Sequence, residues 1–165
     1  MRNLPVIDYA EAKKIIDLIV EKAAQTEKSV VVAVADPHGE LIAFARMDGA
    51  PISSVRIAAN KAWTAARERK TTKEIGSRTR HPEKGHDIAY YGDPVFVGWG
   101  SGIPIWKDGV VAGAVAVSGL SSREDVELAT LRPILEGAEC QPCKPSHNAV
   151  YQAAMLKLFR ASAFV

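Results

Sequence analysis

Hydrophobic positions near the start of the chain recur with the spacing of an amphipathic helix. One face of a 3.6-residue period carries Ala12, Ile15, Ile16, Ile19 and Ala23. Asp8 and Glu11 precede this pattern with the spacing of a capping box, in which each side chain bonds the other residue's backbone N–H. The pattern predicts a helix that begins after Asp8 and ends near Thr26.

The next hydrophobic pattern changes from helical to extended. Residues 30–35 read VVVAVA, a continuous apolar run of strand length, which indicates a strand that is covered on both faces. Residues 36–39, Asp-Pro-His-Gly, have the composition of a tight turn. Residues 40–46 are again mostly apolar, so the segment predicts a β-hairpin.

An alanine-rich helix is predicted directly after this hairpin. Residues 47–51, MDGAP, break the second strand. Ser53 or Ser54 is expected to cap the helix that follows, because serine hydroxyls accept hydrogen bonds from the first free N–H groups of a helix. Lys61 and Trp63 lie inside this helix.

The apolar periodicity is lost in the middle of the chain. Residues 70–94 open with a short predicted helix at Thr71–Glu74, and after Gly76 no regular pattern continues. Connections of this length are typical of functional lids or mobile segments.

A second hairpin is predicted at residues 103–117. Its strands are residues 103–106 and 110–117, and Lys107-Asp108-Gly109 supplies an Asp-Gly turn. Ser121 and Glu124 then form a second capping box, and the helix that they open is expected to continue to Leu135 with a kink at Pro133.

These elements predict an α+β fold, in which a mainly antiparallel sheet is flanked by helices. We expect one domain over residues 1–137. Residues 138–165 form a C-terminal extension that contains two cysteines and a docking helix at about residues 148–164.

Composition excludes several functional classes. The 165 residues carry a net charge of only +2, so we expect no nucleic-acid partner. No apolar run is long enough to span a membrane, and residues 1–8 do not resemble a signal peptide, so a cytoplasmic location is expected without a membrane partner. Two cysteines are too few for a disulfide framework.

The residues of the first hairpin and the following helix resemble a known family. VAVADPHGELIAFARMDGA at residues 32–50, the serine pair and KAWTA at residues 61–65 are similar to the GlcG/HbpS family, which includes haem-binding HbpS, GlcG and the C-terminal domain of PduO-type proteins. The similarity continues through residues 102–105 and 111–119 and covers roughly residues 8–136. It implies a profilin-like fold and a homo-oligomer, from a dimer up to an octamer.

The first candidate site lies where the second strand meets the alanine-rich helix. A helix N-terminus favours an anion, an arginine fork suits a carboxylate, and a lysine seven residues into the helix shares the face of the serine. The candidate ligand-binding residues are Arg46, Asp48, Ser53, Ser54 and Lys61. The alternative is an Arg46–Asp48 ion pair with Lys61 on a solvated face.

Three histidines are further candidates for haem binding or proton transfer. His81 and His86 lie in the long connection beside arginines and tyrosines, a combination that suits a flat anionic ligand such as haem. The alternative is a solvated loop. For His38, in the first turn, we favour an exposed loop histidine over a general base.

The C-terminal extension contains a further set of soft-metal ligands. Cys140, Cys143 and His147 are three ligands, whereas a structural zinc site needs four. We therefore favour two plain thiols over a zinc site.

Three functional hypotheses follow, and the third of them is a purely structural or assembly subunit, which only the apolar C-terminal helix supports. The first is a small-ligand-binding protein whose anionic ligand, as the resemblance implies, is haem or a related tetrapyrrole. The second is a cofactorless enzyme that carries out proton transfer, condensation or isomerisation on a small carboxylate in a catabolic pathway, with Arg46 and Lys61 holding the carboxylate.

Overall fold

The computed structural model describes residues 5–131. In chain order its elements are α1 (Tyr9–Gln25), β1 (Val31–Ala35), β2 (Leu41–Arg46), α2 (Ser53–Glu68), α3 (Thr72–Thr79), the 3-10 helix η1 (Ile88–Tyr91), β3 (Ile103–Lys107), β4 (Val110–Ser118) and α4 (Ser122–Ala129). The cysteine set, the helix at residues 148–164 and the kink at Pro133 lie outside the described residues.

The four strands form one antiparallel sheet in the order β2-β1-β4-β3. Both predicted hairpins are present, and β1 and β4 pair along their length to join them. In the turn between β3 and β4, Asp108 and Gly109 have φ values of 51° and 74°, the left-handed geometry that an Asp-Gly hairpin requires. The predicted α+β class with a mainly antiparallel sheet is confirmed.

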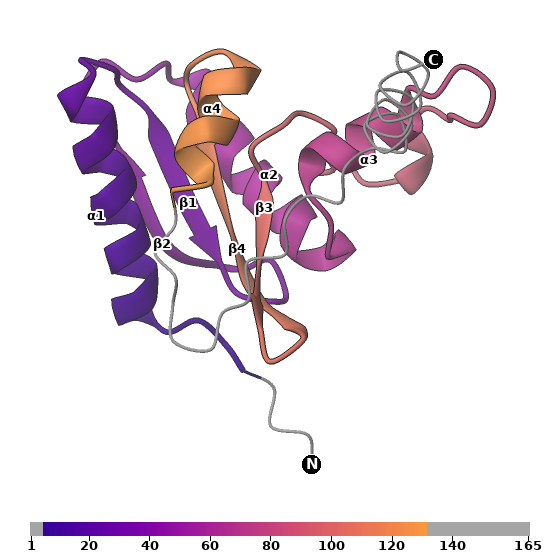
Figure 1. Cartoon of the computed structure of the whole chain (residues 1–165). Coiled ribbons are helices and arrows are strands. Elements are labelled where there is room, and N and C mark those ends of the chain that lie inside the picture. The colour runs from indigo at the N-terminus through magenta and orange to yellow at the C-terminus, as the bar shows by residue number, and fades with distance from the viewer. Residues whose placement is uncertain (1–4, 132–165) are drawn as a thin grey trace, which may run out of the picture.

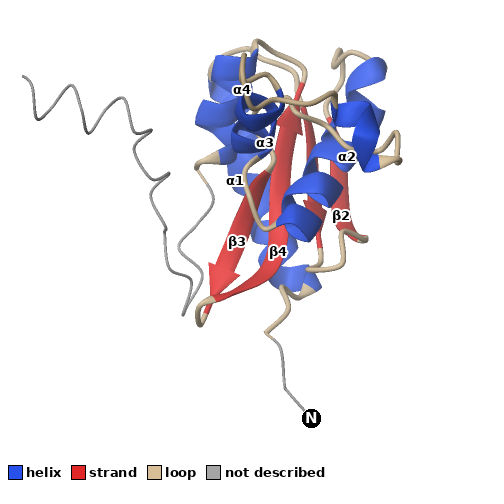
Figure 2. Ribbon diagram, turned by 90° about the vertical axis from the view of Figure 1, so that its right-hand side faces the viewer, coloured by secondary structure: helices blue, strands red, loops and turns tan. Residues whose placement is uncertain are grey.

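Helices cover both faces of the sheet (Figure 1). On one face α1 and α4 pack against the larger side chains of the strands, including Val32, Val34 and Val115. On the other face α2 lies across the strands (Figure 2), where its alanines meet the small side chains of Ala33 and Ala116. Alanine facing alanine lets the axis of α2 approach the sheet closely.

The N-terminus of α1 is capped as predicted. Asp8 accepts a hydrogen bond of 2.8 Å from the Glu11 N–H, and Glu11 accepts one of 3.1 Å from the Asp8 N–H. The predicted serine cap of α2 is wrong, because the N-cap residue is Ile52, which makes no side-chain cap bond. Pro51 begins the helical turn instead, and its carbonyl accepts a 3.0 Å bond from the Ser54 N–H.

The helix α4 is shorter than the predicted helix. Its capping box at Ser121 and Glu124 is confirmed, but the helix ends at Ala129. The hydroxyl of Thr130 donates a 2.7 Å bond to the Glu127 carbonyl, so it satisfies one of the free carbonyl groups at this end.

The long connection after α2 is structured. The predicted short helix is α3, which continues past Gly76 to Thr79. Gly76 lies so close to the Gly98 carbonyl oxygen that a Cβ built on Gly76 would approach it to 1.9 Å. The absence of a side chain at Gly76 therefore lets residues 96–99 pack directly on α3.

Candidate functional site

A buried lysine connects four segments of the chain. The ammonium group of Lys61, on α2, donates hydrogen bonds to the Asp125 carboxylate of α4 at 3.1 Å, to the Val117 carbonyl of β4 at 3.1 Å and to the Ser101 hydroxyl before β3 at 3.0 Å. Lys61 is only 2% exposed and Asp125 3%. The alternative of a solvated Lys61 is therefore excluded.

Burial and mutual attraction have opposite effects on the pKa values of Lys61 and Asp125. Burial lowers the pKa of Lys61, and the attraction of Asp125 opposes that shift. Burial likewise raises the pKa of Asp125, against the attraction of Lys61 and a 3.1 Å bond from the Leu120 N–H. The ion pair is retained in the interior because every charged atom has a polar partner.

A cavity of about 360 Å³ opens above this ion pair. It lies between the N-termini of α2 and α4, and five serines contribute to its walls. The lining residues are Pro51, Ser53, Ser54, Ile57, Lys61, Trp99, Ser118, Gly119, Leu120, Ser121, Ser122 and Asp125. We call it the smaller cavity.

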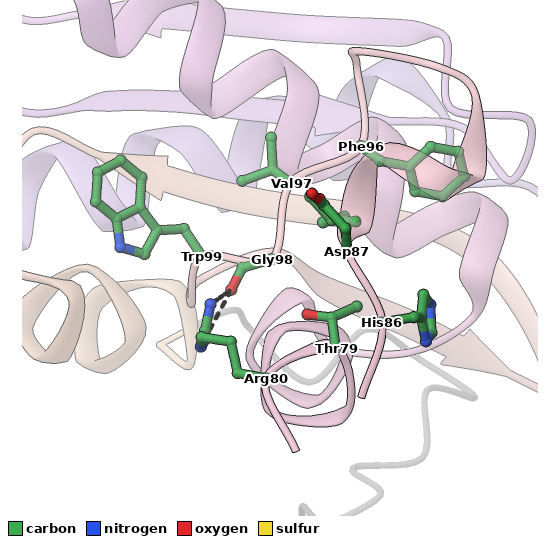
Figure 3. A pocket seen from close by; sticks show the side chains of 9 residues that line it. Thr79, Arg80, His86, Asp87, Phe96, Val97, Gly98 and Trp99 are labelled. Carbon is green, nitrogen blue, oxygen red and sulfur yellow. Dashed lines mark hydrogen bonds between the residues drawn. The ribbon is translucent and has the colours of Figure 1, made fainter. Parts of the chain in front are cut away.

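A second cavity, of about 560 Å³, lies between α3 and the segment that follows η1 (Figure 3). Its walls combine apolar and aromatic side chains with one guanidinium, one imidazole, one carboxylate and one hydroxyl group. The lining residues are Thr79, Arg80, His86, Asp87, Ile88, Phe96, Val97, Gly98 and Trp99. We call it the larger cavity, and its volume falls in the range of small-molecule and cofactor sites.

Aromatic rings hold the wall of the larger cavity against α2. Phe96 stacks on Tyr91 with a centroid distance of 4.3 Å and meets Trp63 of α2 edge to face at 5.2 Å. The Tyr91 ring lies 5.8 Å from the ring of His86. These ring contacts fix the position of the His86 imidazole relative to α2.

The structure brings together three of the five residues of the first candidate site. Ser53, Ser54 and Lys61 line the smaller cavity, whereas Arg46 and Asp48 are exposed and do not line it. Arg46 and Ser118 pair with Val31 from its two sides, so they share a sheet face with their Cα atoms about 10 Å apart. The Asp48 carbonyl accepts a 2.7 Å bond from Ser29.

The three histidines lie in different surroundings. His86 is half-buried and lines the larger cavity. His81 is exposed, and its Nδ1 accepts bonds of 3.2 and 3.1 Å from the N–H groups of Glu83 and Lys84, so that atom is used by the local turn. His38 is exposed, and its carbonyl accepts a 2.6 Å bond from Arg67.

The sequence did not point to three residues that line the cavities, Ser118, Asp125 and Trp99, or to Ser101, which accepts a bond from Lys61. Asp125 is 64 residues from Lys61, and no local pattern reports such a pair. The sequence nevertheless indicated that Lys61 has a charged or polar partner. Lys61 shares the buried face of its helix with Ala58, Ala62 and Ala65, and a buried charge requires such a partner.

Residues 5–131 contain neither a cluster of metal-ligating side chains nor a membrane-spanning helix. Within this range no three side chains of the histidine, cysteine, aspartate or glutamate type come together as a metal site. No helix in the same range is long and apolar enough to cross a membrane.

Most of the chain matches a known protein family. The family described as "Haem degrading protein HbpS-like" matches residues 7–131. An uncharacterized 15.0 kDa protein from the dhaT-dhaS intergenic region of Citrobacter freundii is 33% identical over 128 residues, which are 78% of this chain and 90% of that protein. The corrinoid adenosyltransferase PduO of Salmonella typhimurium is 31% identical over 110 residues, 67% of this chain but only 33% of PduO.

Solved structures with the same fold include a haem complex. Protein ORFY of Klebsiella pneumoniae is 30% identical, with a TM-score of 0.74 over 80% of this chain and 91% of that one. A PduOC–haem complex is 28% identical, with a TM-score of 0.71 over 77% of this chain and 92% of that one.

Proposed function

Because this chain belongs to the family described as haem degrading protein HbpS-like, we propose that it binds haem or a related tetrapyrrole in the larger cavity. One observation carries this proposal: an imidazole, a guanidinium and aromatic walls border the same cavity. Haem requires such a set, with a ligand for iron, a cation for the propionates and apolar surfaces for the macrocycle. The haem complex of the related PduOC supports the choice of ligand.

The residues that line the larger cavity fit the chemistry of haem. His86 would hold the iron, and Arg80 would hold a propionate, because a guanidinium forms two parallel bonds with a carboxylate. In Figure 3 the guanidinium of Arg80 points at the Gly98 carbonyl with two long contacts of 3.4 Å. Contacts of this length are weak, so Arg80 loses little when it turns to a carboxylate.

The apolar walls would exclude water from the faces of the ligand. Ile88, Phe96, Val97 and Trp99 supply these walls, and Trp99 is 60% exposed, an unusual position for so large an apolar side chain. A bound tetrapyrrole would cover the indole. Bound haem would supply a redox-active iron, and the chain would supply orientation and shielding.

A haemin titration of the full chain tests the proposal. We expect a saturable Soret shift at micromolar haemin, and about tenfold weaker binding with a changed Soret position in His86→Ala, a loss of about 1.4 kcal/mol. Arg80→Ala should weaken binding without moving the Soret band, because a propionate contact does not touch iron.

The other two histidines complete the experiment, with His38→Ala as the matched control. His38→Ala lies outside the cavity and should bind haemin like the unmodified chain, and His81→Ala tests whether the second histidine of the connection contributes. The proposal fails if haemin does not saturate the protein, or if His86→Ala and His38→Ala give the same spectrum and affinity.

A further inference from the structure

The smaller cavity contains two nearly buried hydroxyl groups that have no hydrogen-bond partner among residues 5–131. Ser54 and Ser118 are each 4% exposed, and both line the cavity. Within the same range, no fully inaccessible polar side-chain atom lacks a partner. The two hydroxyls therefore reach the space of the cavity, where a polar guest would bond to them.

The N-terminus of α2 brings partial positive charge close to these hydroxyls. Ser53 and Ser122 are the first residues of α2 and α4, so the N-terminal ends of both helices face the cavity. No side chain caps α2, and although the N–H groups of Ser54 and Val55 bond the carbonyls of Pro51 and Ile52, the Ser53 N–H has no partner among residues 5–131. Seven residues deeper on the same face of α2, the Lys61 ammonium forms the floor.

The negative charge of Asp125 is neutralised from within the protein. One oxygen of Asp125 accepts a bond from Lys61 and the other accepts one from the Leu120 N–H. The N-terminus of α4 already has its capping box and acidic first turn, whereas the first turn of α2 has no acidic side chain to match its partial positive charge. An anion is therefore the guest that the electrostatic balance favours.

We propose that the smaller cavity is a second binding site, which takes a small carboxylate. The hydroxyls of Ser54 and Ser118 and the N–H group of Ser53 bind its oxygens, and Lys61 supports its charge from below. Ile57, Trp99 and Leu120 supply an apolar wall for the rest of the molecule. At about 360 Å³ the cavity admits a compound of a few carbon atoms and excludes a tetrapyrrole.

Isothermal titration calorimetry of the full chain with paired probes tests this site. The probes are acetate, butyrate, succinate and benzoate, each paired with its neutral amide of nearly the same shape. We expect at least one carboxylate to bind saturably and its amide to bind at least about tenfold more weakly, because the hydrogen bonds to a charged acceptor are lost.

Substitutions then locate the site. Ser54→Ala and Ser118→Ala should each weaken carboxylate binding about tenfold, whereas Ser77→Ala, at an exposed position on α3, should not change it. Asp125→Asn keeps the shape of the side chain and removes the negative charge, so it should strengthen carboxylate binding. Ser54→Leu should abolish binding by filling the cavity.

Three results would overturn the proposal: no carboxylate saturates, the amides bind as tightly as the carboxylates, or the two alanine variants bind like Ser77→Ala. The haem proposal depends on different residues. His86→Ala should bind carboxylates normally, and Ser54→Ala and Ser118→Ala should bind haemin normally, so each proposal can fail without the other.

Discussion

Lys61 is the residue through which α2, β4, α4 and the segment before β3 meet. Its three ammonium protons have three acceptors, and one of these, Ser101, also donates its own hydroxyl proton to the Val117 carbonyl. The arrangement positions the ends of these elements around the smaller cavity. Its stability depends on charge balance, because either member of the ion pair alone would be an unpaired charge in the interior.

Removing one member of the ion pair should therefore cost more than removing both. Lys61→Met should lower the free energy of unfolding by about 3–5 kcal/mol, because it leaves Asp125 buried without its partner. The double variant Lys61→Met with Asp125→Leu should recover most of that loss. Urea denaturation of the two variants measures the difference.

The Arg123–Glu127 ion pair on α4 provides a control, because both side chains are mostly exposed. Arg123→Met should change the free energy of unfolding by about 0.5 kcal/mol or less. If the double variant at Lys61 and Asp125 is as unstable as Lys61→Met alone, the ion pair does not determine the stability of this region.

Local spacing predicted single residues well where the partner was close in sequence. The capping residues Asp8, Glu11, Ser121 and Glu124 were identified because each box spans only three residues. Ser54 and Lys61 were identified together because helical geometry fixes their common face. Asp125 and Ser101 were not, because the contacts that bring them to Lys61 form only when the sheet and both helices have assembled.

At the scale of elements, α4 is fixed at its N-terminus by charge. Glu124 accepts bonds from Lys28 at 2.8 Å and from the Ser121 hydroxyl at 2.6 Å. The bond from Lys28, followed by the bonds from Ser121, lowers the pKa of Glu124 from 4.5 to about 2. This carboxylate therefore links the start of α4 to the segment that precedes β1.

The lowered pKa predicts a dependence of stability on pH. The contribution of Glu124 is fully present above pH 4.5, its unfolded pKa, and is lost as the pH falls towards 2, where the folded protein also takes up the proton. Glu124→Gln should remove this component, so its urea midpoint should fall less between pH 6 and pH 3 than that of the unmodified chain. Glu127→Gln is the matched control and should follow the unmodified chain.

Element boundaries were predicted less well than the elements themselves. Both hairpins and the start of α1 follow from turn and capping residues, but the start of α2 depends on Pro51 and not on the serines. The long connection lacks an apolar period because it is not fixed by a hydrophobic helix face. Close contacts at glycines and stacked aromatic rings hold it against the rest of the protein instead. Its cavity could not be predicted, since Gly76 and Gly98 meet only in the folded chain.

At the scale of the whole molecule, the described residues form three layers, and β2 lies at one end of their sheet. Leu41 and Phe44 on β2 are 51% and 39% exposed, and Ile52 just before α2 is 71% exposed. Exposed apolar side chains on an unpaired edge strand favour contact with another chain. The homo-oligomer and the cytoplasmic location that the sequence predicts, and the division into residues 1–137 and 138–165, stay predictions.

The oligomer can be measured directly. Size-exclusion chromatography with light scattering should give an even multiple of the 17.8 kDa chain mass, from a dimer up to an octamer. Phe44→Glu should shift the distribution towards smaller species if the β2 edge takes part. A single species of the chain mass at micromolar concentration would contradict the prediction.

Trp99 lines both cavities, so the two proposed sites share one residue. If a ligand in one cavity moves the Trp99 ring, the other cavity changes shape before its own ligand binds. Thermodynamic reciprocity then requires that each guest alter the affinity of the other by the same factor. The fraction of protein with a ligand in one cavity would then depend on the concentration of the compound that binds in the other cavity.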